Sequence, residues 1–189
     1  MKDECRTAGR RRFILHPSAF ILFIACATTP PPPPTLPQWT DVPRGVLDAF
    51  CVRLRDEGIS GEQVINVVAR TQPLINAASI AGLAEASFYQ KKFDPFNLAQ
   101  EANRGAAAMP VAVPKGACAW QPVEESAARS VDTMTIEMSA PFVNPFARHS
   151  IGLFARISLA REAATWYWVP LVERDGRWFA ARPMLMGMR

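Results

Sequence analysis

The spacing of apolar residues predicts a helix at residues 41–58, the first stretch of the chain that could belong to a folded domain. Its apolar positions recur at the three- and four-residue spacing of one helical face, and they are Val46, Leu47, Phe50, Cys51 and Leu54. Asp41-Val42-Pro43 suits the first turn of a helix, and Gly58 suits its end. Cys51 is therefore expected to point into the protein interior.

Two further helices are predicted from residues that can cap them. Asn76 can cap a helix that continues to Phe88. Asp94-Pro95 supplies an N-cap and a first-turn proline for a third, short helix that ends near Gly105. All three predicted helices lie in the first two thirds of the chain.

The sequence of residues 62–71 is compatible with either a helix or a strand. Ser60-Gly61-Glu62-Gln63 fits a capping box at the start of a helix. Val64-Ile65-Asn66-Val67-Val68 is almost entirely β-branched, which suits a pleated surface better than a helix. We predict a strand here.

From Met109 onward the pattern becomes that of strands. Residues 111–121 are expected to form a hairpin that turns at Lys115-Gly116 and carries Cys118 on its return. Residues 133–138 alternate between apolar and polar, which predicts a half-exposed strand, and residues 153–159 alternate in the same way. The fold class is therefore α+β, with helices in the N-terminal half packed on an antiparallel β-meander in the C-terminal half.

The last hairpin has the strongest local signal, because Asp175-Gly176 suits a type I′ turn. This turn pairs Arg174 with Arg177, Glu173 with Trp178 and Val172 with Phe179. One face of the ribbon then carries Trp166, Trp168, Pro170, Val172 and Phe179. The other face carries Tyr167, Val169, Leu171, Trp178 and Ala180. Because both faces are apolar, the ribbon is either covered on both sides or offers one side to a partner.

Helices followed by a sheet that ends in Asp175-Gly176-x-Trp178 resemble the nuclear transport factor two-like domains. The resemblance covers about residues 130–183 and carries over no site residues. It implies a small conical α+β fold with a pocket, and hence a carrier of a small ligand.

The N-terminal residues have the order of a secretory leader. Arg10-Arg11-Arg12 forms a basic region, and residues 13–25 are apolar over a length that suits a signal peptide and is too short to span a bilayer. Phe23-Ile24-Ala25-Cys26 resembles the lipobox of bacterial lipoprotein precursors, with Phe23 where leucine is usual. An uncleaved anchor, or a start downstream of Met1, is the alternative.

The resemblance to lipoprotein precursors implies a domain organisation and a cellular location. Residues 1–25 would be the signal peptide, residues 26–40 the lipidated Cys26 and a Pro-rich linker, and residues 41–189 a single domain. Ala27, in place of an aspartate, favours the outer membrane, with the domain facing the periplasm. The prolines between residues 30 and 37 would form an extended stalk.

The positive charge of the chain belongs to the leader. Residues 1–25 hold five of the 21 basic and two of the 17 acidic residues, so the remainder carries a net charge of +1. Nucleic-acid binding needs a clustered basic face, and Lys91-Lys92 is the only local pair. We therefore expect no nucleic-acid partner.

Two of the four cysteines remain after the leader and Cys26 are set aside. Cys51 and Cys118 form an even pair in an oxidising compartment, which favours a disulfide. The alternative is two buried thiols that never meet. No Cys-x-x-Cys spacing indicates redox catalysis or zinc.

The sequence offers little for catalysis. His149 is the only histidine beyond the leader, and a lone histidine beside Arg148 and Ser150 is more typical of a loop than of a catalytic base. No metal-binding, phosphate-binding or nucleophile motif is present, so neither a metal nor a cofactor is expected.

The aromatic residues near the C-terminus are the remaining candidates for binding. Trp166, Trp168 and Trp178 could stack on a glycan or a peptide of an envelope protein, or they could fill the core. We therefore expect a membrane-anchored periplasmic lipoprotein that acts by non-catalytic binding or structural support. A small-ligand carrier and an envelope hydrolase built around His149 are the alternatives.

Overall fold

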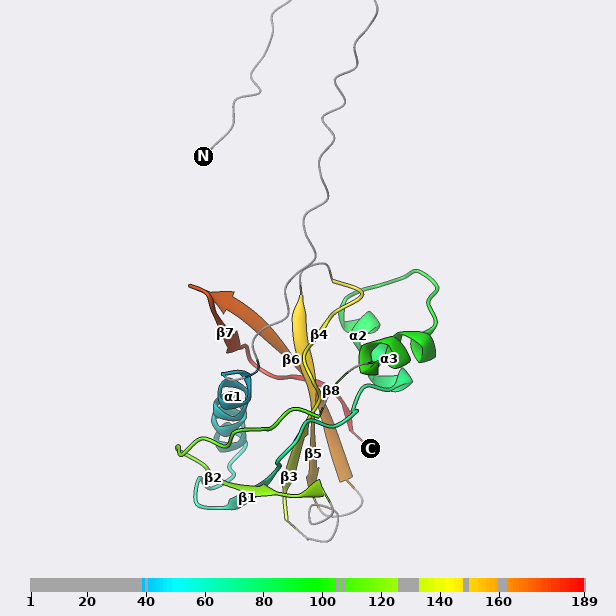
Figure 1. The fold of residues 1–189 in the computed structure, drawn as a ribbon. Coiled ribbons are helices and arrows are strands. Elements are labelled where there is room, and N and C mark those ends of the chain that lie inside the picture. The colour runs from blue at the N-terminus through cyan, green and yellow to red at the C-terminus, as the bar shows by residue number, and fades with distance from the viewer. Residues whose placement is uncertain are drawn as a thin grey trace, which may run out of the picture. The chain divides into compact units, whose positions relative to one another are not determined.

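The computed structural model describes residues 39, 41–104, 106, 108–125, 133–147, 150–159 and 163–188. Within these ranges the chain forms three helices and eight strands, and the helices precede most of the strands (Figure 1). The predicted α+β class is confirmed. The predicted leader, Cys26, the prolines between residues 30 and 37, and His149 lie outside the described residues.

The predicted helices form, and the residues predicted to cap the second and third helices do so, whereas Asp41 makes no side-chain capping bond. The helices are α1 (Val42–Asp56), α2 (Ala77–Ala86) and α3 (Pro95–Asn103). The Asn76 side chain accepts a hydrogen bond from the Ser79 amide, and the Ser79 hydroxyl accepts one from the Asn76 amide, which completes a capping box. Asp94 Oδ1 accepts hydrogen bonds from the Phe96 and Asn97 amides at 2.9 and 3.3 Å.

The strands form a single sheet in the order β2-β1-β3-β5-β6-β7, with β4 also paired to β5 and β8 also paired to β6. Their bounds are β1 Val64–Val68, β2 Ala119–Val123, β3 Thr135–Met138, β4 Phe142–Val143, β5 Ile151–Leu159, β6 Ala163–Arg174, β7 Arg177–Ala180 and β8 Met184–Met188. The strand predicted within residues 62–71 is confirmed as β1. The pairings among β3 to β8 are antiparallel, as predicted for the C-terminal half.

The prediction of a hairpin at residues 111–121 is wrong. Only β2 forms from it, and β2 pairs in parallel with β1, as β3 does on the other side of β1. Parallel pairing is possible because α2 and α3 lie between β1 and β2 in the chain and supply the long crossover that it needs. Pro114, within the predicted hairpin, lacks the amide hydrogen that a paired strand would donate.

Strand β3 is buried along its whole length rather than half exposed. Thr135 and Glu137, the polar positions of the alternation, are only 2 % and 5 % exposed. Their burial follows from the position of β3 in the interior of the sheet, between β1 and β5.

The register predicted for the last hairpin is confirmed at all three residue pairs. Asp175 and Gly176 have φ angles of 52° and 73°, the positive values that a type I′ turn requires at both positions. The turn residues therefore set the pairing of β6 with β7.

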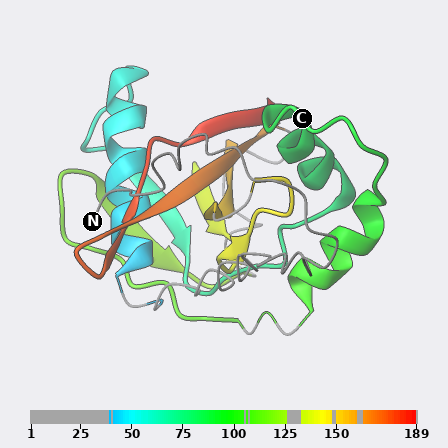
Figure 2. The same cartoon turned by 90° about the horizontal axis from the view of Figure 1, so that it is seen from above.

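Helices cover both faces of the sheet, and this explains why both faces of β6 are apolar. Figures 1 and 2 show α1 on one side of the sheet, with α2 and α3 on the other. The first core joins α1 to Ile65, Ile136, Leu153, Tyr167 and Val169, among others. The second core joins α2 and α3 to Phe142, Phe154 and Trp168.

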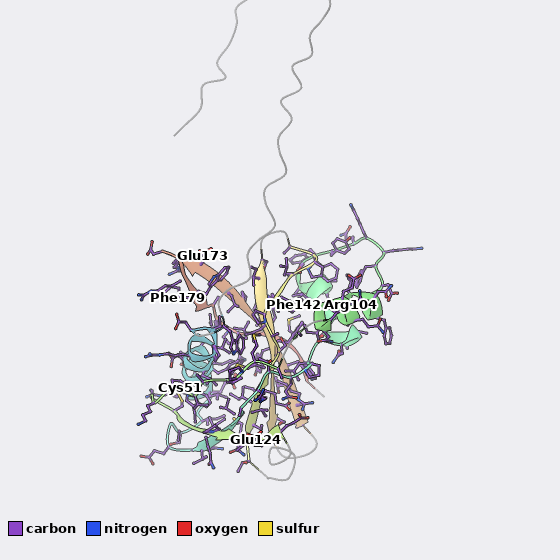
Figure 3. All side chains as sticks on the ribbon, in the orientation of Figure 1. Cys51, Arg104, Glu124, Phe142, Glu173 and Phe179 are labelled. Atoms are coloured by element: carbon purple, nitrogen blue, oxygen red, sulfur yellow. A yellow bond between two sulfur atoms is a disulfide. The ribbon has the colours of Figure 1, made fainter. Side chains whose placement is uncertain are left out.

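The disulfide ties α1 to the sheet. Cys51 on α1 and Cys118, just before β2, have sulfur atoms 2.07 Å apart and are both buried (Figure 3). Both cysteines and every member of the two cores lie between Trp39 and Met186. The disulfide and the two cores that the structure describes are therefore formed entirely by residues from Trp39 onward.

Candidate functional site

A groove of about 530 Å³ opens beside Trp39, between α3 and β4, and we call it the Trp39 groove. Its volume lies in the range of small-molecule sites. Its walls are mostly apolar: they are formed by Trp39, Ile80, Leu98, Glu101, Ala102, Arg104, Ala106, Met109, Ala140, Pro141, Phe142, Val143 and Pro145. An apolar lining of this kind favours an apolar ligand or segment.

The break between β3 and β4 shapes one wall of the groove. Ser139 fixes this break, because its hydroxyl donates to the Ala140 carbonyl and accepts from the Phe154 amide. Pro141 follows, and β4 then pairs with β5. On the opposite wall, the indole of Trp39 donates a hydrogen bond to the Pro110 carbonyl, which holds the ring against the segment that follows α3.

Arg104 supplies a positive charge to the groove. It follows the last turn of α3, and both Arg104 and Phe142 line the groove (Figure 3). Arg104 also lines a second hollow of about 540 Å³ along α3, whose walls include Ile75, Phe96 and Ala99. Its side chain is exposed and forms no ion pair with any described residue. An anionic group in either hollow could therefore bind it.

The three tryptophans singled out as candidate binding residues pack against the two cores. Trp168 is 3 % exposed and contacts the rings of Phe142 and Phe154, with centroid distances of 5.2 and 5.4 Å. Trp166 is half-buried, with the Arg156 guanidinium 5.7 Å from its ring centroid. Trp178 is half-buried against the first core. The groove is lined instead by Trp39, which the sequence analysis missed although it stands alone just after the prolines.

The buried carboxylate of Glu137 was also missed. Its side chain is 7 % exposed, and Oε2 accepts a hydrogen bond from Nε of Arg156, the residue opposite it on β5, and forms an ion pair with a terminal nitrogen of the same guanidinium. Arg156 is in turn held over Trp166. A buried carboxylate can serve as an acid or a base, but this one is engaged by an arginine that belongs to the same sheet.

Within the described ranges, no group of three or more His, Cys, Asp or Glu side chains could hold a metal ion. No helix among those described is long and apolar enough to cross a bilayer. His149 lies outside the described residues, so its proposed role as a base stays a prediction.

Comparisons with protein-family models, with curated proteins and with solved structures each find no match. The resemblances to lipoprotein precursors and to nuclear transport factor two-like domains therefore stay predictions.

Proposed function

We propose that this chain is a lipid-anchored protein of a bacterial cell envelope, whose domain binds a small apolar ligand with an anionic group and catalyses no reaction. The order of basic region, apolar run, Cys26 and prolines supports the anchor. The bond between Cys51 and Cys118 fits an oxidising compartment such as the periplasm. Ala27 supports the outer membrane as the site of anchoring.

The ligand class is suggested by one observation: the Trp39 groove combines apolar walls with the free positive charge of Arg104. A glycan would need many polar partners, whereas the lining of this groove is mainly prolines, alanines and the rings of Trp39 and Phe142, with Glu101 and Arg104 as its charged members. An apolar chain that ends in a carboxylate would satisfy both features. The combination of apolar walls with a positive charge favours a small-ligand carrier over a protein with a purely structural role.

Replacing Arg104 with glutamine should weaken the binding of dodecanoate about fivefold, because a charged hydrogen bond in a partly exposed site contributes about 1 kcal/mol. Binding of dodecanol, which has the same chain and no charge, should be unchanged. Isothermal titration calorimetry of both compounds checks this.

The matched control is Arg55→Gln, since Arg55 is exposed on α1 and does not line the groove. It should leave both affinities unchanged. If Arg104→Gln and Arg55→Gln weakened dodecanoate binding equally, the loss would come from the lower net charge of the protein. The result would contradict binding of the carboxylate by Arg104 in the Trp39 groove.

The anchor is tested by the intact mass of the protein extracted from membranes. We expect a mass that begins at Cys26 and includes acyl chains, and that rises by two protons on reduction. A full-length or unlipidated mass would contradict both the proposed lipid anchor and the proposed location at the outer membrane.

A further inference from the structure

The tip of the β6–β7 hairpin exposes apolar and positively charged side chains together. Val172 and Phe179 are 40 % and 49 % exposed, and they are paired with each other across the hairpin, so they form one contiguous apolar surface. Arg174 and Arg177 are exposed next to them. We call these four residues the hairpin patch.

The pairing places all four side chains on one face. Val172 is opposite Phe179 and Arg174 is opposite Arg177, and residues two apart along a strand point to the same side. The acidic neighbour Glu173 is opposite Trp178, so both belong to the other face. Neither arginine of the hairpin patch forms an ion pair with a described residue.

The hairpin patch lies at the end of the domain where the linker joins it. Strand β7 packs against the start of α1: a Cβ built on Gly45 would lie 3.4 Å from the Ala180 amide nitrogen. Figure 1 shows the tip of β6 and β7 at the same end as the beginning of α1, and Figure 3 labels Phe179 and Glu173 there. The start of α1, the first helix of the described domain, therefore lies beside this hairpin.

We propose that the hairpin patch docks on the surface of an anionic phospholipid bilayer. Arginines near such a surface are attracted to the lipid phosphates, and exposed apolar side chains beside them can enter the interface. The inference rests in part on the proposed anchor. Trp39 is thirteen positions after Cys26, and an extended polyproline stalk of that length reaches about 40 Å.

A second copy of the chain fits the hairpin patch less well than a bilayer. A symmetric dimer through this face would bring the arginines of two copies together with no acidic residue on the same face to offset them. A lipid surface instead supplies the missing negative charge at high density.

The test uses the chain from Ala27 onward, which contains the whole domain but neither the leader nor Cys26. We expect it to co-sediment with vesicles of phosphatidylcholine containing about one-third phosphatidylglycerol, and to bind pure phosphatidylcholine vesicles much less. Added salt should weaken the binding. The double variant Arg174→Gln/Arg177→Gln should lower the partition coefficient about 25-fold, or about fivefold for each charge removed.

Two further variants separate the contribution of the apolar side chains to vesicle binding from a general effect of protein charge. Val172→Ser/Phe179→Ser should lower binding at least tenfold. Lys91→Gln/Lys92→Gln, an exposed basic pair between α2 and α3, should leave it unchanged. All these side chains are exposed, so a thermal unfolding curve should show that each variant folds.

Three results would overturn docking on lipid. One is equal loss of binding in the lysine variant, and another is no binding by the unchanged chain. The third is a concentration-dependent dimer that the hairpin variants abolish, which would assign the hairpin patch to a second copy. Because this chain lacks Cys26, any of these results leaves the anchor to be decided separately by the mass measurement.

Discussion

Replacing Cys51 with serine should lower the free energy of unfolding by about 4 kcal/mol under oxidising conditions. The bond joins residues 67 apart, and on the chain-entropy model its main effect is to remove conformations from the unfolded chain. For a domain of this size the melting temperature should fall by roughly 8–16 °C. Thermal or urea unfolding with and without a thiol reductant measures the effect.

The reductant is the control for this prediction. Once the bond is reduced, the original chain and the Cys51→Ser variant differ only by a buried thiol and a buried hydroxyl, so their stabilities should converge. Cys118→Ser should behave like Cys51→Ser, and the double replacement should add little to either. An equal loss of stability in the presence of reductant would show that the cost comes from packing at Cys51 rather than from the bond.

The local features of the fold could be predicted because each is specified by neighbouring residues. Asn76 and Asp94 can each bond amides within their own helix, so their identity indicates where α2 and α3 begin. Asp175-Gly176 sets the register of β6 and β7 because a two-residue turn with positive φ angles permits one pairing. The inward direction of Cys51 follows from the helical spacing alone.

The pairing of distant strands could not be predicted from such local patterns. The sequence of β2 shows that it suits a strand, but its position beside β1 depends on the path of α2 and α3 between them. The same limit applies to β3: alternation of polar and apolar residues indicates one solvent-facing side only if nothing covers that side. Glu137 is buried because Arg156, on another strand, neutralises it there.

The candidate site was missed for a related reason. Trp39 was assigned to the linker, and nothing near it in the sequence indicates that it would face Phe142 and Arg104, which lie far along the chain. Trp168, within the conspicuous aromatic run, is a core residue because β6 is covered on both faces. A cluster of tryptophans along the sequence therefore identified a buried strand better than it identified a binding surface.

Replacing Gly152 with alanine should destabilise the domain by about 3 kcal/mol, although the change adds a single methyl group. Gly152 lies on β5 opposite Pro170 of β6, and the Trp168 ring covers it. A Cβ at this position would lie 2.5 Å from Trp168 Cη2 and 2.6 Å from the Val169 carbonyl oxygen. The ring cannot easily move away, because Phe142 and Phe154 pack against it. Urea unfolding measures the loss.

Gly187→Ala is the matched control, since a Cβ on Gly187 meets nothing within 4 Å and β8 pairs with the same strand, β6. It should change the stability by less than about 0.5 kcal/mol. In a Trp168→Phe background, Gly152→Ala should cost less, because the smaller ring vacates part of the space that the methyl group needs. Since the Val169 carbonyl remains, the relief should be partial. An unchanged cost in that background would assign the whole penalty to the backbone contact and none to the tryptophan.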